Sequence, residues 1–127
     1  MSADDIVRLG YVPAPQKQLL VQHCHTVVAL AIYEGFGISA LEGMEAGKVV
    51  LVSDNGSLKE VVGNAGYTVD PFSTTSITKR FVQIDGLEDN PKKQYIPNRL
   101  AVFDQTLQTK KLLQHLSKLV AQPSLTP

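Results

Sequence analysis

The sequence predicts an α/β fold with a parallel sheet of about four strands, flanking helices and a helical C-terminal region. Short apolar runs rich in β-branched residues alternate with helical patterns. Two of these runs, TVVALAI and VVLVS, are apolar on both faces, as strands buried in a parallel sheet are. No further strand pattern follows residue 72, so the remaining chain is expected to be helical.

The first elements begin the alternation of strands and helices. IVRLGYV, at 6–12, has the composition of a strand, and Pro13 and Pro15 end it. QKQLLVQHC, at 16–24, predicts a short helix. TVVALAI, at 26–32, predicts a buried strand.

The next four elements repeat the pattern. They are a helix at 38–46, a strand at 49–53, a helix at 57–63 and a strand at 66–70. Gly47 stands where the first of these helices ends, and Pro71 follows the last strand.

The chain beyond the sheet reads as helices. Segments 73–84 and 91–103 have helical patterns, and Pro97 is expected to break or kink the second. Residues 104–120 place leucines and Val120 on one stripe, which predicts an amphipathic helix. We therefore divide the chain into a partial sheet domain, 1–103, and a C-terminal helix with its tail, 104–127.

Composition limits the possible functions. The chain has 127 residues, of which 43% are hydrophobic, and a formal net charge of zero, so no overall field favours nucleic acid. Acidic residues are in excess up to residue 78, and basic residues are in excess after it. The basic part could face an acidic partner, or it could be a solvated helical face. The single Cys24 excludes an internal disulfide. Without an apolar run long enough to span a bilayer, we expect a cytoplasmic chain, with peripheral attachment to a membrane left open.

A glycine-rich turn, YEGFG at 33–37, follows one buried strand and precedes a helix. In parallel α/β sheets, ligands bind beyond the carboxyl ends of the strands. Gly35 and Gly37 allow positive φ and close backbone approach. The amides of Gly37, Ile38 and Ser39 would then lie at a helix N-terminus that favours a phosphate. Glycines in such turns also serve packing alone.

Two carboxylates accompany the turn. Glu34 stands at the exit of the strand, where a ligand role competes with that of an ordinary surface glutamate. Glu42 follows after seven intervening residues. SALE also fits a capping box in which Ser39 is the N-cap and Glu42 reaches back to it, and SLKE repeats that pattern at Ser57. We expect both carboxylates to face one hollow.

EGFGISALE resembles the E-x7-E motif of retaining glycosyltransferases of the large family four, which have the GT-B fold. The segment EAGKVVLVSDNGSLKEVVGNAGYTVDP is also similar to that family, and the resemblance extends over about residues 6–120. It implies a truncated GT-B C-terminal domain, which is Rossmann-like and binds a nucleotide-sugar donor such as a UDP- or GDP-sugar. It implies no metal and no other cofactor.

The resemblance also implies roles for single residues. Glu34 matches the motif glutamate that contacts donor sugar hydroxyls near the reacting carbon, so it is the catalytic candidate. Glu42 matches the glutamate that holds the nucleotide ribose. The donor-binding turn, whose amides would face the sugar and the diphosphate, comprises Gly35, Phe36, Gly37, Ile38 and Ser39.

The match is incomplete. A first Rossmann-like domain, which carries most of the acceptor site, and the opening βα units of the second are absent from this sequence. We therefore expect an inactive fragment with an open edge at strand 26–32. Strand 6–12 could pair there directly, two copies could associate, or a missing N-terminal domain or subunit could supply the rest. The alternatives are a degenerate, non-catalytic domain that acts as a protein-interaction module and an unrelated flavodoxin-like phosphate binder.

Overall fold

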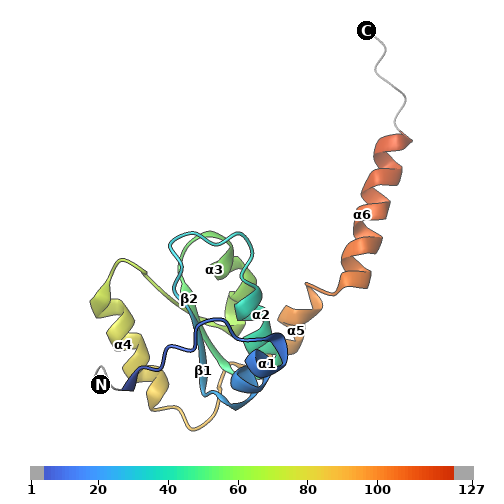
Figure 1. Cartoon of the computed structure of the whole chain (residues 1–127). Coiled ribbons are helices and arrows are strands. Elements are labelled where there is room, and N and C mark those ends of the chain that lie inside the picture. The colour runs from blue at the N-terminus through green and yellow to red at the C-terminus, as the bar shows by residue number, and fades with distance from the viewer. Residues whose placement is uncertain (1–4, 122–127) are drawn as a thin grey trace.

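A computed structural model of the chain describes residues 5–121. A short sheet forms its middle layer, and helices cover both faces of that sheet (Figure 1). The strands are β1 (Thr26–Ala29), β2 (Val49–Ser53) and β3 (Tyr67–Val69). The helices are α1 (Ala14–His23), α2 (Ile38–Glu45), α3 (Gly56–Val62), α4 (Thr74–Asp85), α5 (Ile96–Ala101) and α6 (Gln105–Val120). Two short 3₁₀ turns, η2 (Gly63–Ala65) and η3 (Lys93–Tyr95), complete the order.

All strands of this sheet are parallel, in the order β1-β2-β3. Thr26 pairs with Val49, and Leu51 pairs with Tyr67. Every residue of β2 is buried, because it has a neighbouring strand on each side and helices over both faces. The predicted α/β class with a parallel sheet is confirmed, with three strands rather than about four.

The side chains of β2 alternate between two hydrophobic clusters, one on each face of the sheet. Val50 and Val52 belong to the cluster formed with α2 and α3. Val49 and Leu51 belong to the other, which also contains Ile84 of α4. Accordingly, α4 covers one face, and α2, α3 and α5 cover the other (Figure 1).

The strand predicted at 6–12 is wrong. These residues run without sheet pairing, and the side chains of Val7 and Tyr11 are 76% and 93% exposed. A strand requires a neighbour to satisfy its backbone N–H and C=O groups, and no described segment provides one here. Of the three alternatives left open for the edge of β1, direct pairing with 6–12 is therefore excluded, and the outer edge of β1 is unpaired within residues 5–121.

The helices predicted at 16–24, 38–46, 57–63, 73–84 and 104–120 are present with small shifts at their ends. The single helix predicted at 91–103 is wrong in extent, because η3 and the short α5 form there instead. Pro97, which was expected to break or kink that helix, lies in the first turn of α5, where a missing N–H costs nothing. Asp104 caps α6 by accepting a hydrogen bond from the Leu107 amide at 2.8 Å. Helix α6 extends away from the body (Figure 1), and the apolar stripe around Leu112 and Leu116 is about half exposed.

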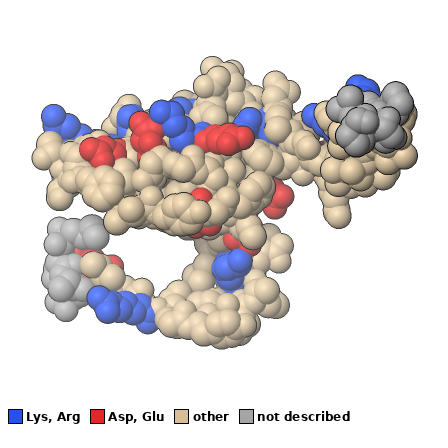
Figure 2. Space-filling view, turned by 90° about the horizontal axis from the view of Figure 1, so that it is seen from above, with Lys and Arg blue, Asp and Glu red and all other residues tan. Residues whose placement is uncertain are grey.

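On the face that Figure 2 shows, acidic and basic side chains lie next to one another rather than in separate patches. Across residues 5–121, no helix combines the length and the apolar character that crossing a bilayer requires.

Candidate functional site

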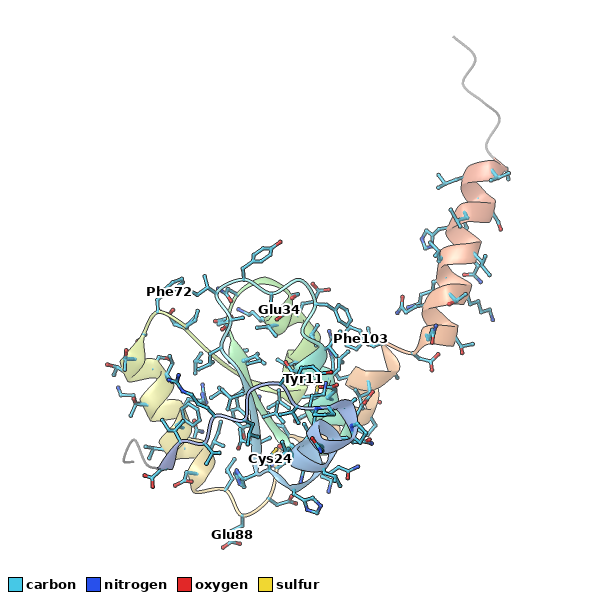
Figure 3. All side chains as sticks on the ribbon, in the orientation of Figure 1. Tyr11, Cys24, Glu34, Phe72, Glu88 and Phe103 are labelled. Carbon is cyan, nitrogen blue, oxygen red and sulfur yellow. The ribbon has the colours of Figure 1, made fainter. Side chains whose placement is uncertain are left out.

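The turn 33–37 lies where β1 leaves the sheet, at the edge formed by the carboxyl ends of the strands. Figure 3 places Glu34 at this end of the body and Glu88 at the opposite end. The helix predicted at 38–46 is present as α2 and begins directly after the turn. The strand–turn–helix arrangement that the sequence predicted is therefore present.

Gly37 is the N-cap of α2 and has a φ of 98°. A Cβ at this buried position would lie 2.7 Å from Cδ2 of Leu58, which is itself fully buried. Both the backbone angle and the space require glycine here. Gly35 differs, because its φ is not positive and a Cβ there would meet no atom within 4 Å. The structure thus gives no steric reason for glycine at position 35.

The first turn of α2 directs backbone amides toward this edge. The carbonyl of Gly37 accepts from the amides of Ala40 and Leu41, at 3.0 and 3.3 Å. The amides of Ile38 and Ser39 precede these first intrahelical bonds, so they have no partner within the helix. Both residues are exposed. The amides at such a helix end can donate hydrogen bonds to a bound anion.

Two polar side chains from the neighbouring strand–helix connection fix the turn. Asn55 Nδ2 donates to the carbonyl of Ile32 at 2.8 Å. The Ser57 hydroxyl donates to the carbonyl of Glu34 at 2.6 Å. The capping box predicted at Ser57 is therefore wrong, because α3 starts one residue earlier and this hydroxyl is used across the sheet edge.

Phe36 joins the turn to the C-terminal helices. Its ring meets Phe103 edge to face, with centroids 5.7 Å apart. The guanidinium of Arg99 lies over the ring of Phe103, with Cζ 4.9 Å from the ring centroid. Arg99 Nε also donates to the Val61 carbonyl at 2.8 Å. Phe36, predicted as a donor-binding residue, thus has a packing role that the sequence did not reveal.

Glu34 is half-buried. Its Oε1 lies 3.5 Å from the amide nitrogen of Phe36, the limit of a hydrogen bond, so the carboxylate is held only loosely by its own turn. A carboxylate with such a weak local partner can accept hydrogen bonds from hydroxyl groups of a ligand.

Glu42 lies one turn into α2 and pairs with α1. Its Oε1 is 2.6 Å from Lys17 Nζ, and the two side chains are 31% and 49% exposed. The capping box predicted for Ser39 and Glu42 is wrong, because the helix begins at Ile38 with Gly37 as its cap and no side-chain cap bond forms. A hollow of about 360 Å³ opens beside Glu42, between α1 and α2. Glu34 is not among the residues of its walls, so the expectation that both carboxylates face one hollow is wrong for this hollow: Glu42 turns toward Lys17 of α1, whereas Glu34 stays in the turn.

Ser53 is a polar residue of this edge that sequence reasoning missed. It ends β2 and is fully buried, and its Oγ has no hydrogen-bond partner in the described part of the chain. The only sequence signal is a hydroxyl that closes an otherwise apolar strand.

Cys24 and His25, which adjoin the start of β1, both have hydrogen-bond partners in the backbone. Cys24 Sγ donates to the Val21 carbonyl at 3.3 Å, and His25 Nε2 lies 3.1 Å from the Leu87 carbonyl oxygen. No group of histidine, cysteine or acidic residues within 5–121 is arranged to hold a metal ion.

Comparison with known proteins identifies relatives. The family described as "Glycosyl transferases group 1" matches residues 2–101. The O-antigen chain mannosyltransferase B of Escherichia coli is 41% identical over 75 residues, which are 59% of this chain and 20% of that protein. The alpha-1,3/1,6-mannosyltransferase ALG2 of Dictyostelium discoideum is 35% identical over 107 residues, 83% of this chain and 25% of that protein.

A solved structure agrees in fold. The glycosyltransferase from Rickettsia africae ESF-5 superimposes with a TM-score of 0.60 at 16% identity, over 76% of this chain and 28% of that one. The chain thus spans about a quarter of the length of the relatives it matches.

Proposed function

The chain belongs to the glycosyl transferases group 1, and on this premise we propose that it is the nucleotide-sugar-binding portion of a retaining glycosyltransferase. The complete enzyme would transfer a glycosyl group from a nucleoside-diphosphate sugar to an acceptor. The observation that carries the proposal is the turn 33–37, in which Gly37 at positive φ starts a helix whose first amides face the carboxyl edge of the sheet.

Each group at this edge has a role in the proposed reaction. The bond between the anomeric carbon and the diphosphate oxygen breaks, a bond from that carbon to an acceptor hydroxyl oxygen forms, and the hydroxyl proton passes to the departing diphosphate. The amides of Ile38 and Ser39 would stabilise the negative charge that grows on the departing diphosphate. Glu34 would accept hydrogen bonds from hydroxyls of the donor sugar, and Glu42 would accept from the ribose.

The ion pair of Glu42 places a condition on this role. To bind a ribose hydroxyl, the carboxylate must share its oxygens between that hydroxyl and Lys17. A carboxylate has about four lone-pair sites, so one lysine contact leaves acceptor capacity. A half-exposed ion pair of this kind contributes about 0–1 kcal/mol to stability, so a ligand can displace the lysine.

We expect negligible transfer activity from these 127 residues alone. They span about a quarter of the relatives' length, and positioning both reactants supplies a large share of the rate in such reactions. Donor binding is therefore the appropriate test.

The first experiment titrates the full chain with GDP-mannose and UDP-glucose by calorimetry. Mannose comes first because two relatives are named mannosyltransferases. Glu34→Gln should weaken binding about tenfold or more, the value of a charge-assisted hydrogen bond. Glu88→Gln, which removes the same charge at the opposite end of the body, should leave binding unchanged. Equal losses in both variants, or no binding by the natural chain, would refute the proposal.

The second experiment separates the ligand role of Glu42 from its structural role. Glu42→Gln and Lys17→Met both remove the ion pair, but only the first removes the carboxylate. Binding should fall in Glu42→Gln and persist in Lys17→Met, while the unfolding free energies of the two variants stay similar. Loss of binding in Lys17→Met to the same extent would reduce Glu42 to a structural residue.

A second candidate function, a non-catalytic interaction module, is favoured by the unpaired edge of β1, where Val28 is 41% exposed. A missing domain, a separate subunit or a second copy would dock there. A chain that binds no nucleotide sugar but associates through this edge would support that alternative.

A further inference from the structure

A basic hollow of about 430 Å³ lies beside the edge strand β3, at the amino-terminal end of that strand. Its walls include Gly66, Tyr67 and Thr68 of this edge together with three basic side chains, Lys59, Arg80 and Lys92. None of the residues that line the hollow is acidic. None belongs to the turn 33–37 or to α2, so the hollow is separate from the proposed donor site.

Tyr67 brings two of these cations together. Arg80 Cζ lies 5.5 Å from the centroid of its ring, and Lys92 Nζ lies 4.5 Å from the same centroid. Arg80 comes from the middle of α4, whereas Lys92 comes from the segment before η3. The fold therefore places two like charges around one buried tyrosine, where each gains a cation–π contact and where an anion between them would offset their mutual repulsion.

The surroundings of Lys92 disfavour its charged form, mainly because the side chain is partly buried. Burial, and secondarily the neighbouring Arg80, lower the pKa of its ammonium below the usual value. No carboxylate pairs with Lys92 or Arg80 among the ion pairs of the described residues. The third cation differs, because Lys59 Nζ lies 2.6 Å from Asp54 Oδ1.

The two cations keep unused donors. Lys92 Nζ donates to the Gly66 carbonyl at 2.6 Å, and Arg80 Nη1 donates to Gln83 Oε1 at 2.7 Å. An ammonium has three N–H donors and a guanidinium has five, so most of their donors are not accounted for by these bonds. The planar fork of an arginine suits the paired oxygens of a phosphate.

We propose that this hollow binds a phosphate group, held by Arg80 and Lys92 above the edge of β3. A phosphate monoester carries close to two negative charges at neutral pH, which matches the two cations, neither of which has an acidic partner among residues 5–121. The proposal concerns phosphate chemistry as such, carried by a free phosphate or by the headgroup of a phospholipid. It does not depend on donor binding at the turn 33–37.

The test titrates the full chain with inorganic phosphate and with pyrophosphate, followed by calorimetry and by the amide resonances of 66–68. Arg80→Gln combined with Lys92→Gln should weaken binding at least about tenfold. Lys79→Gln combined with Lys93→Gln changes the net charge equally, from exposed neighbours of the same two residues, and should leave binding unchanged. Arg80→Lys should retain part of the affinity because it keeps the charge without the fork.

Vesicles identify the source of the phosphate. Phosphatidic acid offers a monoester, phosphatidylglycerol offers only a diester, and phosphatidylcholine is the neutral control. Binding to free phosphate that the Arg80 and Lys92 substitutions weaken supports a soluble ligand. Binding to phosphatidic acid alone, with the same dependence on these residues, supports a lipid headgroup. If neither ligand binds in a way that depends on them, the proposal is overturned.

A measurement on the natural chain keeps the proposal testable even if the substituted chains do not fold. The pKa of Lys92, followed by the resonances of its Cε methylene, should rise when phosphate is added, because an anion favours the ammonium form. Saturating phosphate that leaves this pKa unchanged would also overturn the proposal.

Discussion

At the scale of single residues, Gly37 and Gly35 of the same turn can be compared as a test position and its control. Gly37→Ala should lower the unfolding free energy by about 1–3 kcal/mol, because it forces a side chain into the left-handed region and against Leu58. Gly35→Ala should change stability little, since its Cβ enters open space. Urea denaturation of both variants measures the difference. A loss of donor binding in Gly35→Ala, with stability retained, would indicate ligand contact; equal destabilisation of both would contradict the assigned backbone roles.

Lys92 gives a prediction in the alkaline range. Its folded-state pKa lies below the usual value of 10.5, with burial as the main cause. Between the two values the unfolded chain binds more protons, so stability increases with pH across that window. The natural chain should therefore gain stability relative to Lys92→Met as pH rises toward 10.5, measured by urea unfolding. Lys93→Met is the control, and a relative loss for the natural chain would contradict the sign.

The sequence predicted the residues of the turn better than their partners. Gly37 was predictable because a strand–turn–helix junction leaves few other choices. The capping roles of Ser39 and Glu42 were predicted wrongly, since the signature does not fix which residue starts the helix. The cluster of Arg80 and Lys92 at Tyr67 had no sequence signal, because tertiary contacts alone assemble it.

At the scale of elements, the contact between Phe36 and Phe103 couples the turn to the segment after α5. A double-mutant cycle with Phe36→Ala and Phe103→Ala should yield a coupling free energy of about 0.5–1.5 kcal/mol, as edge-to-face pairs do. Thermal unfolding of the four proteins provides the measurement. Strictly additive effects would show that the turn is positioned without α5, leaving Asn55 and Ser57 as its supports.

Elements with both faces covered were predicted most accurately. The strand at 49–53 has the predicted bounds, because a short run rich in valine that is apolar on both faces is typical of a strand buried in a parallel sheet. The strand at 6–12 failed, although its composition favours one, because pairing depends on a neighbour that local sequence does not encode. The strand predicted at 26–32 ends at Ala29, where its pairing with Val52 stops.

For the whole molecule, the edge of β1 that is unpaired within residues 5–121 is the surface from which we expect association. We expect concentration-dependent self-association, because an apolar edge offers its backbone groups to another chain. Val28→Lys should reduce this association in sedimentation velocity experiments by placing a charge on the edge strand. Val82→Lys adds the same charge to the exposed surface of α4 and serves as the control. Equal effects of both substitutions would indicate that net charge, rather than the edge, controls association.

The overall architecture was predictable from the sequence, and the chain spans about a quarter of its relatives, as expected of a partial domain. Alternating patterns predict a parallel sheet with covering helices, and the resemblance to glycosyltransferases is consistent with the family match.

The central position of β2 determines how isotope exchange would spread through the molecule. Its amides bond within a ladder that has a strand on each side and buried clusters above and below. Deuterium should therefore label α1 and α6 within the first time points, then the outer strands, and reach residues 49–53 last, only through opening of the whole body. A labelling map with that order would identify this single strand as the slowest-exchanging core around which every other segment opens and closes.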